Sequence, residues 1–245
     1  MKCRNYAHRG ASGNYPENTM MAFQKALEAG CEGMEFDVHL TRDGELVIIH
    51  DETIDRTSNS TGWVKDMTYE ELCQVDFSYK WAGQVPFQKI PTLREYFELV
   101  KDRDIISNIE LKTGVYEYPG IEAAVYAMLK EYGLEKKVVV SSFNHLSVLR
   151  MKALDPAIEC GFLSEAWLLE AGSYVSRYGV EDFHPHFAML TDTMVAELRA
   201  HNVGINTWTV NDPEDIRLMI RFKVDGIISN YPDRVTKALR DAGLR

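Results

Sequence analysis

GMEFDVHL, residues 33–40, alternates acidic or polar side chains with apolar ones along a run that is typical of a β-strand. Successive side chains of a strand point to opposite faces, so Glu35, Asp37 and His39 share one face and the apolar residues between them share the other. In a barrel, the apolar face packs on helices and the acidic face points inward. An edge strand with two solvated acids is the alternative interpretation, but the apolar alternation requires one buried face.

Short apolar runs of this kind alternate with helical patterns along the chain, which is typical of βαβ units around a parallel sheet. The predicted strands are Arg4–His8, Gly33–Leu40, Leu46–His50, Asp104–Leu111, Lys137–Phe143, Ile158–Leu163, a short piece near Phe183, Val203–Thr209 and Asp225–Ser229. The predicted helices are Thr19–Ala29, Leu93–Lys101, Ile121–Tyr132, Leu146–Leu154, Leu168–Tyr178, Thr193–His201, Pro213–Phe222 and Arg234–Ala242.

If Gly33–Leu40 and Leu46–His50 count as one hairpin, about eight β/α units remain, and this number predicts an α/β protein with a TIM (β/α)₈ barrel. A doubly wound sheet is the alternative, but no GxGxxG motif follows the first strand. We expect one domain over residues 1–245. Residues 52–91 lack long periodic runs and contain several aromatics, so we expect a small insertion or subdomain there.

The composition predicts a soluble globular protein rather than a binder of polyanions. The net charge of the 245-residue chain is −10, which argues against general nucleic-acid affinity and against adhesion to an anionic membrane. The four cysteines have no metal-site spacing and are expected to be buried or free thiols. The N-terminus contains no apolar signal region, so we expect a cytoplasmic location.

A second charged strand end lies in NIELKTG, residues 108–114, where Glu110 and Lys112 share one face. Barrel active sites form at the carboxyl ends of the strands. Glu110 can therefore join Glu35 and Asp37, and a hard divalent cation is the simplest way to stabilise three buried acids. A buried Lys–Glu pair with a purely structural role is the alternative.

Two histidines also lie at strand ends. His50 follows the apolar run LVII, and His8 begins HRGASGNYPENT, residues 8–19. Imidazoles titrate near neutral pH and can act as acid and base around one reacting centre. Arg9 provides a planar fork suited to a phosphate. In the same stretch Asn18 is expected to cap the following helix.

Later segments carry weaker signals. His184 lies near the sixth strand and Trp208 near the seventh, where Trp208 is more typical of a core residue than of a site. Asn211–Pro213 reads as a helix start. Asn230 and Asp233 read as turn or cap residues.

Taken together, these motifs resemble the glycerophosphodiester phosphodiesterase family. HRGASGNYPENT resembles the family's HRG-x₅-PENT opening, EFDVHLTRDGELVIIHD its second block and NIELK its third-strand ExK. Further similar segments, in family order, are IDRTSNSTG, IPTL, SSFN, INTWTVN and VDGIISNYPD. The resemblance covers nearly the whole chain.

The resemblance implies a TIM barrel with an insertion after the second strand, and metal-dependent hydrolysis of a glycerophosphodiester to sn-glycerol 3-phosphate and an alcohol. It implies His8 and His50 as catalytic acid and base, in either order. Glu35, Asp37 and Glu110 would bind one divalent cation, Mg²⁺ or Ca²⁺. Arg9 and Lys112 would bind the phosphate, with His184 and Trp208 near the substrate.

Two other functions stay open at this stage. A lysophospholipase D-like phosphodiesterase would act on longer-chain lysolipids, with the aromatic insertion covering the acyl chain. A non-catalytic barrel that binds metal and phosphate is the second alternative, although both histidines and all three acids are present. The partner expected is a small-molecule diester, with no nucleic acid and no stable membrane association. The sequence does not determine the oligomeric state or the alcohol.

Overall fold

The computed structural model describes residues 3–245, apart from the side chain of Tyr79. Nine strands in this range form one sheet in the order β1-β9-β8-β7-β6-β5-β4-β2-β3, and β1 also pairs with β2. The β1–β2 pairing closes eight parallel strands into a barrel. These strands are β1 (Arg4–His8), β2 (Gly33–Leu40), β4 (Ile106–Leu111), β5 (Val138–Ser142), β6 (Glu159–Ser164), β7 (Asp182–Pro185), β8 (Gly204–Thr207) and β9 (Gly226–Ser229). The predicted TIM barrel is confirmed.

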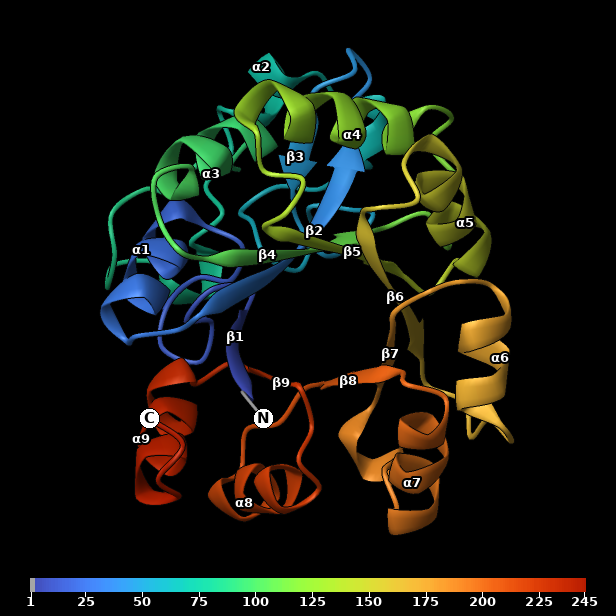
Figure 1. Cartoon of the computed structure of the whole chain (residues 1–245). Coiled ribbons are helices and arrows are strands. Elements are labelled where there is room, and N and C mark those ends of the chain that lie inside the picture. The colour runs from blue at the N-terminus through green and yellow to red at the C-terminus, as the bar shows by residue number, and fades with distance from the viewer. Residues whose placement is uncertain (1–2) are drawn as a thin grey trace.

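Helices surround the barrel, as Figure 1 shows along a view close to the barrel axis. They are α1 (Met20–Glu28), α3 (Leu93–Val100), α4 (Ile121–Tyr132), α5 (His145–Leu154), α6 (Ala171–Arg177), α7 (Asp192–Ala200), α8 (Pro213–Arg221) and α9 (Pro232–Asp241). A continuous apolar cluster fills the space between strands and helices, and Phe23, Phe36 and Tyr96 form edge and tilted ring contacts within it. The outward face of β2 thus packs as its alternation predicts.

Several helix starts differ from the prediction by one to three residues, and those of α1 and α6 have a clear physical cause. Thr19, rather than Asn18, caps α1, since its side chain accepts a hydrogen bond from the backbone N–H of Ala22. Asn18 has a left-handed backbone, with a φ of 54°, and its side chain donates to Asp37 Oδ2 instead. The predicted helix at Leu168 begins only at Ala171, because Glu170 also takes a left-handed conformation that a helix cannot include.

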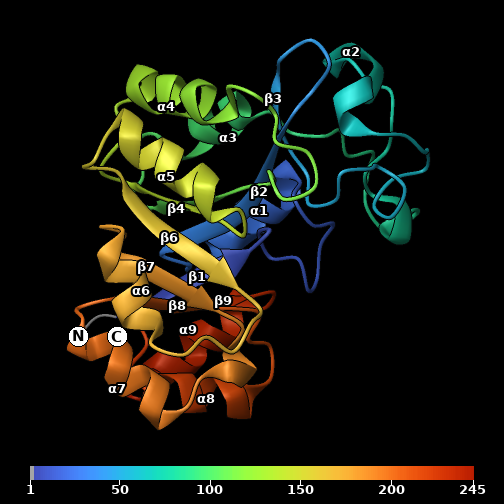
Figure 2. The same cartoon turned by 90° about the vertical axis from the view of Figure 1, so that its right-hand side faces the viewer.

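The predicted strand Leu46–His50 forms β3 (Leu46–Ile48), which pairs antiparallel with β2 outside the barrel. The chain from β3 to α3 contains α2 (Tyr69–Leu72) and two 3₁₀ turns, Val64–Asp66 and Tyr79–Trp81. In Figure 2 this segment projects on the side toward which β6 and β7 point. A second apolar cluster anchors it, formed by Val47, Ile49, Ile54, Val64, Leu72, Val75, Phe77 and Ile90.

Two expectations outside the site can be checked directly. All four cysteines are free thiols, and three of them are buried. Over residues 3–245, the structure contains no helix that is long and apolar enough to cross a membrane.

Candidate active site

Two adjacent strands, β2 and β4, bring the three predicted acids together beside the carboxyl end of β1. In the register of β1 with β2, His8 lies opposite Glu35, and in that of β2 with β4, Asp37 lies opposite Glu110. Partners across parallel strands have side chains on the same face. The alternation in GMEFDVHL and NIELK therefore places these residues side by side inside the barrel end.

Glu35, Asp37 and Glu110 form a cluster in which one carboxylate oxygen from each lies within 4.8 Å of the others. All three are buried. Within the described part of the chain, Glu35 Oε2 and Asp37 Oδ1 are buried without a hydrogen-bond partner. Burial and the charges of Asp37 and Glu110 raise the pKa of Glu35 well above its usual value. Converging, unsatisfied hard oxygens fit a divalent cation.

Two basic side chains balance part of this negative charge. Lys112 Nζ lies 2.9 Å from Glu110 Oε1 and 3.8 Å from Asp37 Oδ1, and Arg9 Nε lies 3.4 Å from Asp37 Oδ2. Burial alone would raise the pKa of Asp37, but Arg9 and Lys112 hold it well below its usual range. The cluster thus combines three acidic side chains with two basic ones, so a bound cation would balance the remaining negative charge.

The ring of His8 lies between Glu35 and the last barrel strand. Its Nδ1 is 2.5 Å from Asn230 Oδ1, and its Nε2 is 3.8 Å from Glu35 Oε2. Burial, and next the charge of Arg9, lower the pKa of His8 to about 3. The ring is therefore neutral at neutral pH in the protein alone.

His50 lies two residues after the end of β3. Its Nδ1 is 2.6 Å from Asp51 Oδ1, so the ring is held by the adjacent carboxylate. Its backbone carbonyl is 3.2 Å from Nε2 of the buried His39, whose Nδ1 contacts the hydroxyl of Tyr118. Both the ring and the backbone of His50 are thus fixed by neighbouring groups.

Both histidines, Arg9 and two of the three acids line one cavity of about 80 Å³ at the barrel end. Its lining residues are His8, Arg9, Glu35, His50, Asn108, Glu110, Ser141, Phe143, Leu163, Glu165, Trp208 and Ile228. Trp208 is therefore a wall residue, with its ring edge against Phe143 and its Nε1 donating to the His184 carbonyl. Asp37 and Lys112 lie behind Arg9 and Glu110, which they contact.

His184 does not line this cavity. It is fully buried inside the barrel, where its Nε2 is 3.1 Å from Asn206 Nδ2. A Cβ atom at Gly161 would lie 2.3 Å from the same nitrogen, so the ring occupies the space that this glycine leaves free. His186, two residues further along the chain, packs its ring against Trp208.

Several residues of the site were missed in the sequence. Asn230 holds His8, Asn18 donates to Asp37 Oδ2 at 2.9 Å, and Glu17 accepts from Arg9 Nη1 at 2.9 Å. Asn230 directly follows the last barrel strand, so the strand-end argument that found Lys112 applied to it as well. Glu17 and Asn18 lie in PENT, where only Asn18 was interpreted, as a helix cap.

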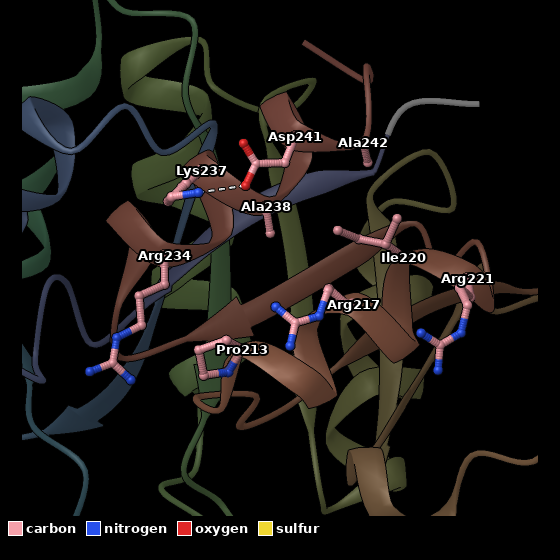
Figure 3. Close-up of a pocket in the computed structure, with 9 residues that line it drawn as sticks. All are labelled: Pro213, Arg217, Ile220, Arg221, Arg234, Lys237, Ala238, Asp241 and Ala242. Atoms are coloured by element: carbon pink, nitrogen blue, oxygen red, sulfur yellow. Dashed lines mark hydrogen bonds and ion pairs between the residues drawn. The ribbon is translucent and has the colours of Figure 1, made fainter.

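A larger groove, of about 520 Å³, lies on the outside of the barrel between α8 and α9 (Figure 3). Arg217, Arg221, Arg234 and Lys237 line it, and Lys237 pairs with Asp241. It contains none of the acids and histidines described above. The smaller cavity is therefore the candidate active site.

A parallel barrel that gathers acids, imidazoles and cations at the carboxyl ends of its strands has the arrangement of a barrel enzyme. The model of the glycerophosphoryl diester phosphodiesterase family matches residues 8–234. The chain belongs to this family. The resemblance seen in the motifs, and with it the assignment to an enzyme class, is confirmed.

Relatives and solved structures agree over nearly the full length. A glycerophosphodiester phosphodiesterase of Caldanaerobacter subterraneus subsp. tengcongensis is 42% identical over 99% of this chain and 100% of its own. One of Bacillus altitudinis is 42% identical over 95% and 96%. An Oleispira antarctica phosphodiesterase, solved with the product sn-glycerol-3-phosphate, matches with a TM-score of 0.89 and 28% identity, covering 96% of each chain.

Proposed function

We propose that this chain hydrolyses glycerophosphodiesters to sn-glycerol 3-phosphate and an alcohol. In this proposal His8 and His50 are the acid and base, and Glu35, Asp37 and Glu110 hold one divalent cation. The observation that carries it is that both imidazoles face a single cavity whose walls include Arg9 and two of the three acids. Family membership and the product held by the Oleispira antarctica relative support the reaction class.

In the proposed mechanism Arg9, in the cavity wall, binds the non-bridging phosphate oxygens, where charge builds up in the transition state. Lys112 adds positive charge from behind Glu110 and reaches the phosphate when substrate binds. A divalent cation, Mg²⁺ or Ca²⁺, supplies further positive charge at this place when bound. Trp208 and Phe143 form an apolar wall against which the carbon atoms of the substrate pack.

The two histidines have different partners, which suggests their order of action. Asn230 Oδ1 accepts the Nδ1 hydrogen of His8, so Nε2 keeps its lone pair and can remove the proton of the glycerol 2-hydroxyl. As this oxygen bonds to phosphorus, the bond to the leaving alcohol breaks. His50, whose ring is hydrogen-bonded to Asp51, gives that alcohol a proton.

The cyclic phosphate formed in this step is opened by water, with the roles reversed. His50 takes a proton from the water while His8 returns its proton to the glycerol 2-oxygen. Both rings then regain their starting protonation, and sn-glycerol 3-phosphate is released.

The test is release of glycerol 3-phosphate from a panel of glycerophosphodiesters, with EDTA, Mg²⁺ or Ca²⁺. We expect chelator-sensitive turnover, and a fall in kcat of about 100-fold or more in His8→Ala and His50→Ala. His201→Ala, on the barrel exterior after α7, is the matched control and should keep full activity. Near-wild-type turnover by His8→Ala contradicts the assignment. A chain that binds the ion tightly but hydrolyses no diester would instead support the non-catalytic alternative.

A second candidate function has one specific observation in its favour. A groove of about 590 Å³ adjoins the active-site cavity and shares Phe143, Leu163 and Glu165 with it. Its other lining residues include Leu168 and the almost fully exposed Leu169. An apolar chain attached to the diester would bury surface there, as in a lysolipid.

Relative rates on glycerophosphocholine and lysophosphatidylcholine separate these functions. If the groove holds an acyl chain, Leu169→Glu slows lysolipid turnover and leaves glycerophosphocholine turnover unchanged. A wild-type protein that strongly prefers glycerophosphocholine excludes the lysolipid function.

We further propose that the protein works in the cytoplasm on small-molecule diesters, without nucleic acid or a stable membrane partner. The net charge of −10 supports this, because polyanions and anionic lipid surfaces repel such a chain. Co-sedimentation with anionic vesicles would contradict it.

A further inference from the structure

Arg56, from the segment between β3 and α3, connects two acids, Glu17 and Asp51, that lie outside the active-site cavity. It donates to Asp51 through Nε, at 2.7 Å, and Nη2, at 3.0 Å. It also donates to Glu17 through Nη1, at 2.9 Å, and Nη2, at 2.8 Å. Each acid thus receives two hydrogen bonds from one planar guanidinium, the arrangement that fixes geometry most strongly.

Each of these acids also holds a residue of the cavity wall. Glu17 Oε1 accepts from Arg9 Nη1 at 2.9 Å, and Asp51 Oδ1 lies 2.6 Å from His50 Nδ1. Charges therefore alternate along the series Arg9, Glu17, Arg56, Asp51 and His50. The first and last members line the cavity, and the three in the middle do not.

Removal of the guanidinium would leave Glu17 and Asp51 facing each other as like charges. Glu17 is largely buried, so their repulsion would be poorly screened by water. The two acids would separate and carry Arg9 and His50 with them. The position of Arg56 is itself fixed, because Ile54, two residues earlier, is fully buried in the second apolar cluster.

We infer that Arg56 is a positioning residue, which sets the distance between Arg9 and His50 in the cavity wall without touching the substrate. The inference rests on the proposed function. It also gives the insertion a role, since its apolar cluster is the support from which Arg56 reaches the barrel loops.

The experiment compares Arg56→Ala and Arg56→Lys with the wild type on glycerophosphocholine. We expect kcat to fall about 10- to 100-fold in Arg56→Ala, because small misplacement of reacting groups has an effect of that size, and KM to change less. Arg56→Lys keeps the charge but cannot make two bidentate contacts, so it should recover only part of the loss. Added guanidinium ion, at non-denaturing millimolar concentration, should restore part of the kcat of Arg56→Ala.

Arg42→Ala is the matched control. Arg42 also joins the insertion to the barrel, through Glu71 and the carbonyl of Asp66, but it contacts no residue of the cavity wall. It should keep its kcat and should not respond to guanidinium. A kcat for Arg56→Ala within twofold of the wild type overturns the inference. The inference is also overturned if the loss of kcat in Arg56→Ala is explained by its lower melting temperature alone and guanidinium does not restore it.

A second readout does not depend on turnover. The ¹⁵N resonances of the His50 ring should differ between the wild type and Arg56→Lys, because Asp51 changes its position against Nδ1. Wild-type protein that hydrolyses no glycerophosphodiester would refute the proposed function. The ring resonances would then decide the inference by themselves, and identical spectra would overturn it.

Discussion

His8 Nδ1 lies 2.5 Å from Asn230 Oδ1, although 222 positions separate the two residues in the chain. They meet because β1 and β9 are neighbours in the closed barrel. With the amide oxygen facing Nδ1, the neutral ring carries its hydrogen on Nδ1 and presents the Nε2 lone pair toward Glu35 and the cavity. Asn230 thereby selects the tautomer whose Nε2 can accept a proton.

Replacement of this amide tests its role. In Asn230→Ala the ring of His8 is free to rotate and to adopt the other tautomer, so we expect kcat to fall about 10-fold or more with little change in KM. Steady-state kinetics on glycerophosphocholine measures this. Asn14→Ala, an exposed position in the loop after β1, is the control and should match the wild type. Unchanged kcat in Asn230→Ala would show that other contacts suffice to orient His8.

The carboxylate cluster makes a prediction about stability rather than activity. Without a divalent ion, Glu35→Gln removes one of three crowded acids, so the variant should be at least as stable as the wild type. With Ca²⁺ or Mg²⁺ at about 100 times its Kd, the wild type should gain about 2.7 kcal/mol, and the variant much less. Thermal unfolding with and without the ion gives both numbers, and Glu98→Gln on α3 is a surface control. If the ion raised the free energy of unfolding equally in the wild type and in Glu35→Gln, the ion would bind at another site.

Alternation along single strands carried most of what the sequence could predict about the site. Glu35 and Asp37 share a face by the two-residue period of a strand, and the same rule pairs Glu110 with Lys112. In a barrel, the carboxyl ends of all parallel strands meet at one end, where active sites form. The convergence of these four residues could therefore be predicted without knowing the strand register. His8 and His50 were found by the same strand-end rule.

Contacts that depend on loop paths could not be predicted in this way. Arg56 reaches Glu17 and Asp51 across 39 and 5 positions, and neither spacing has a helical or strand period. The two-residue period of a strand also does not predict how deep within the barrel a residue lies. His184 points inward as its strand requires, yet it fills the interior beside Asn206 rather than the cavity.

That packing of His184 makes a prediction of its own. A methyl group at Gly161 would overlap the imidazole inside a closed barrel, where neighbouring strands cannot move apart freely. We expect Gly161→Ala to lower the free energy of unfolding by about 1–3 kcal/mol, the usual effect of overpacking. Urea unfolding followed by circular dichroism measures it. Gly114→Ala, where an added Cβ meets nothing within 4 Å, should change stability far less. Equal midpoints for both variants would contradict this account of the barrel interior.

The pH dependence of stability should carry the signature of Glu17. Burial alone would raise the pKa of this carboxyl, but hydrogen bonds from Arg56 and the charges of Arg9 and Arg56 lower it to about 2. Because the folded pKa lies below the unfolded one, the unfolded chain binds more protons in between, and stability falls as pH drops through that window. The contribution is complete above about pH 5 and amounts to roughly 3 kcal/mol for a shift of this size.

Glu17→Gln should therefore be less stable than the wild type at pH 7, and the difference should shrink steadily as pH falls from 5 toward 2. Urea midpoints at several pH values measure it. Glu28→Gln serves as the control, since Glu28 is exposed and forms an ion pair with Lys25 of the same helix. The change in stability with pH must differ between Glu17→Gln and Glu28→Gln, because, of the two carboxyls, only that of Glu17 is shielded from water and held by two guanidinium groups. A difference between wild type and Glu17→Gln that stays constant from pH 7 to pH 2 would mean that the carboxyl contributes through shape, and that its charge is not what ties Arg9 to Arg56.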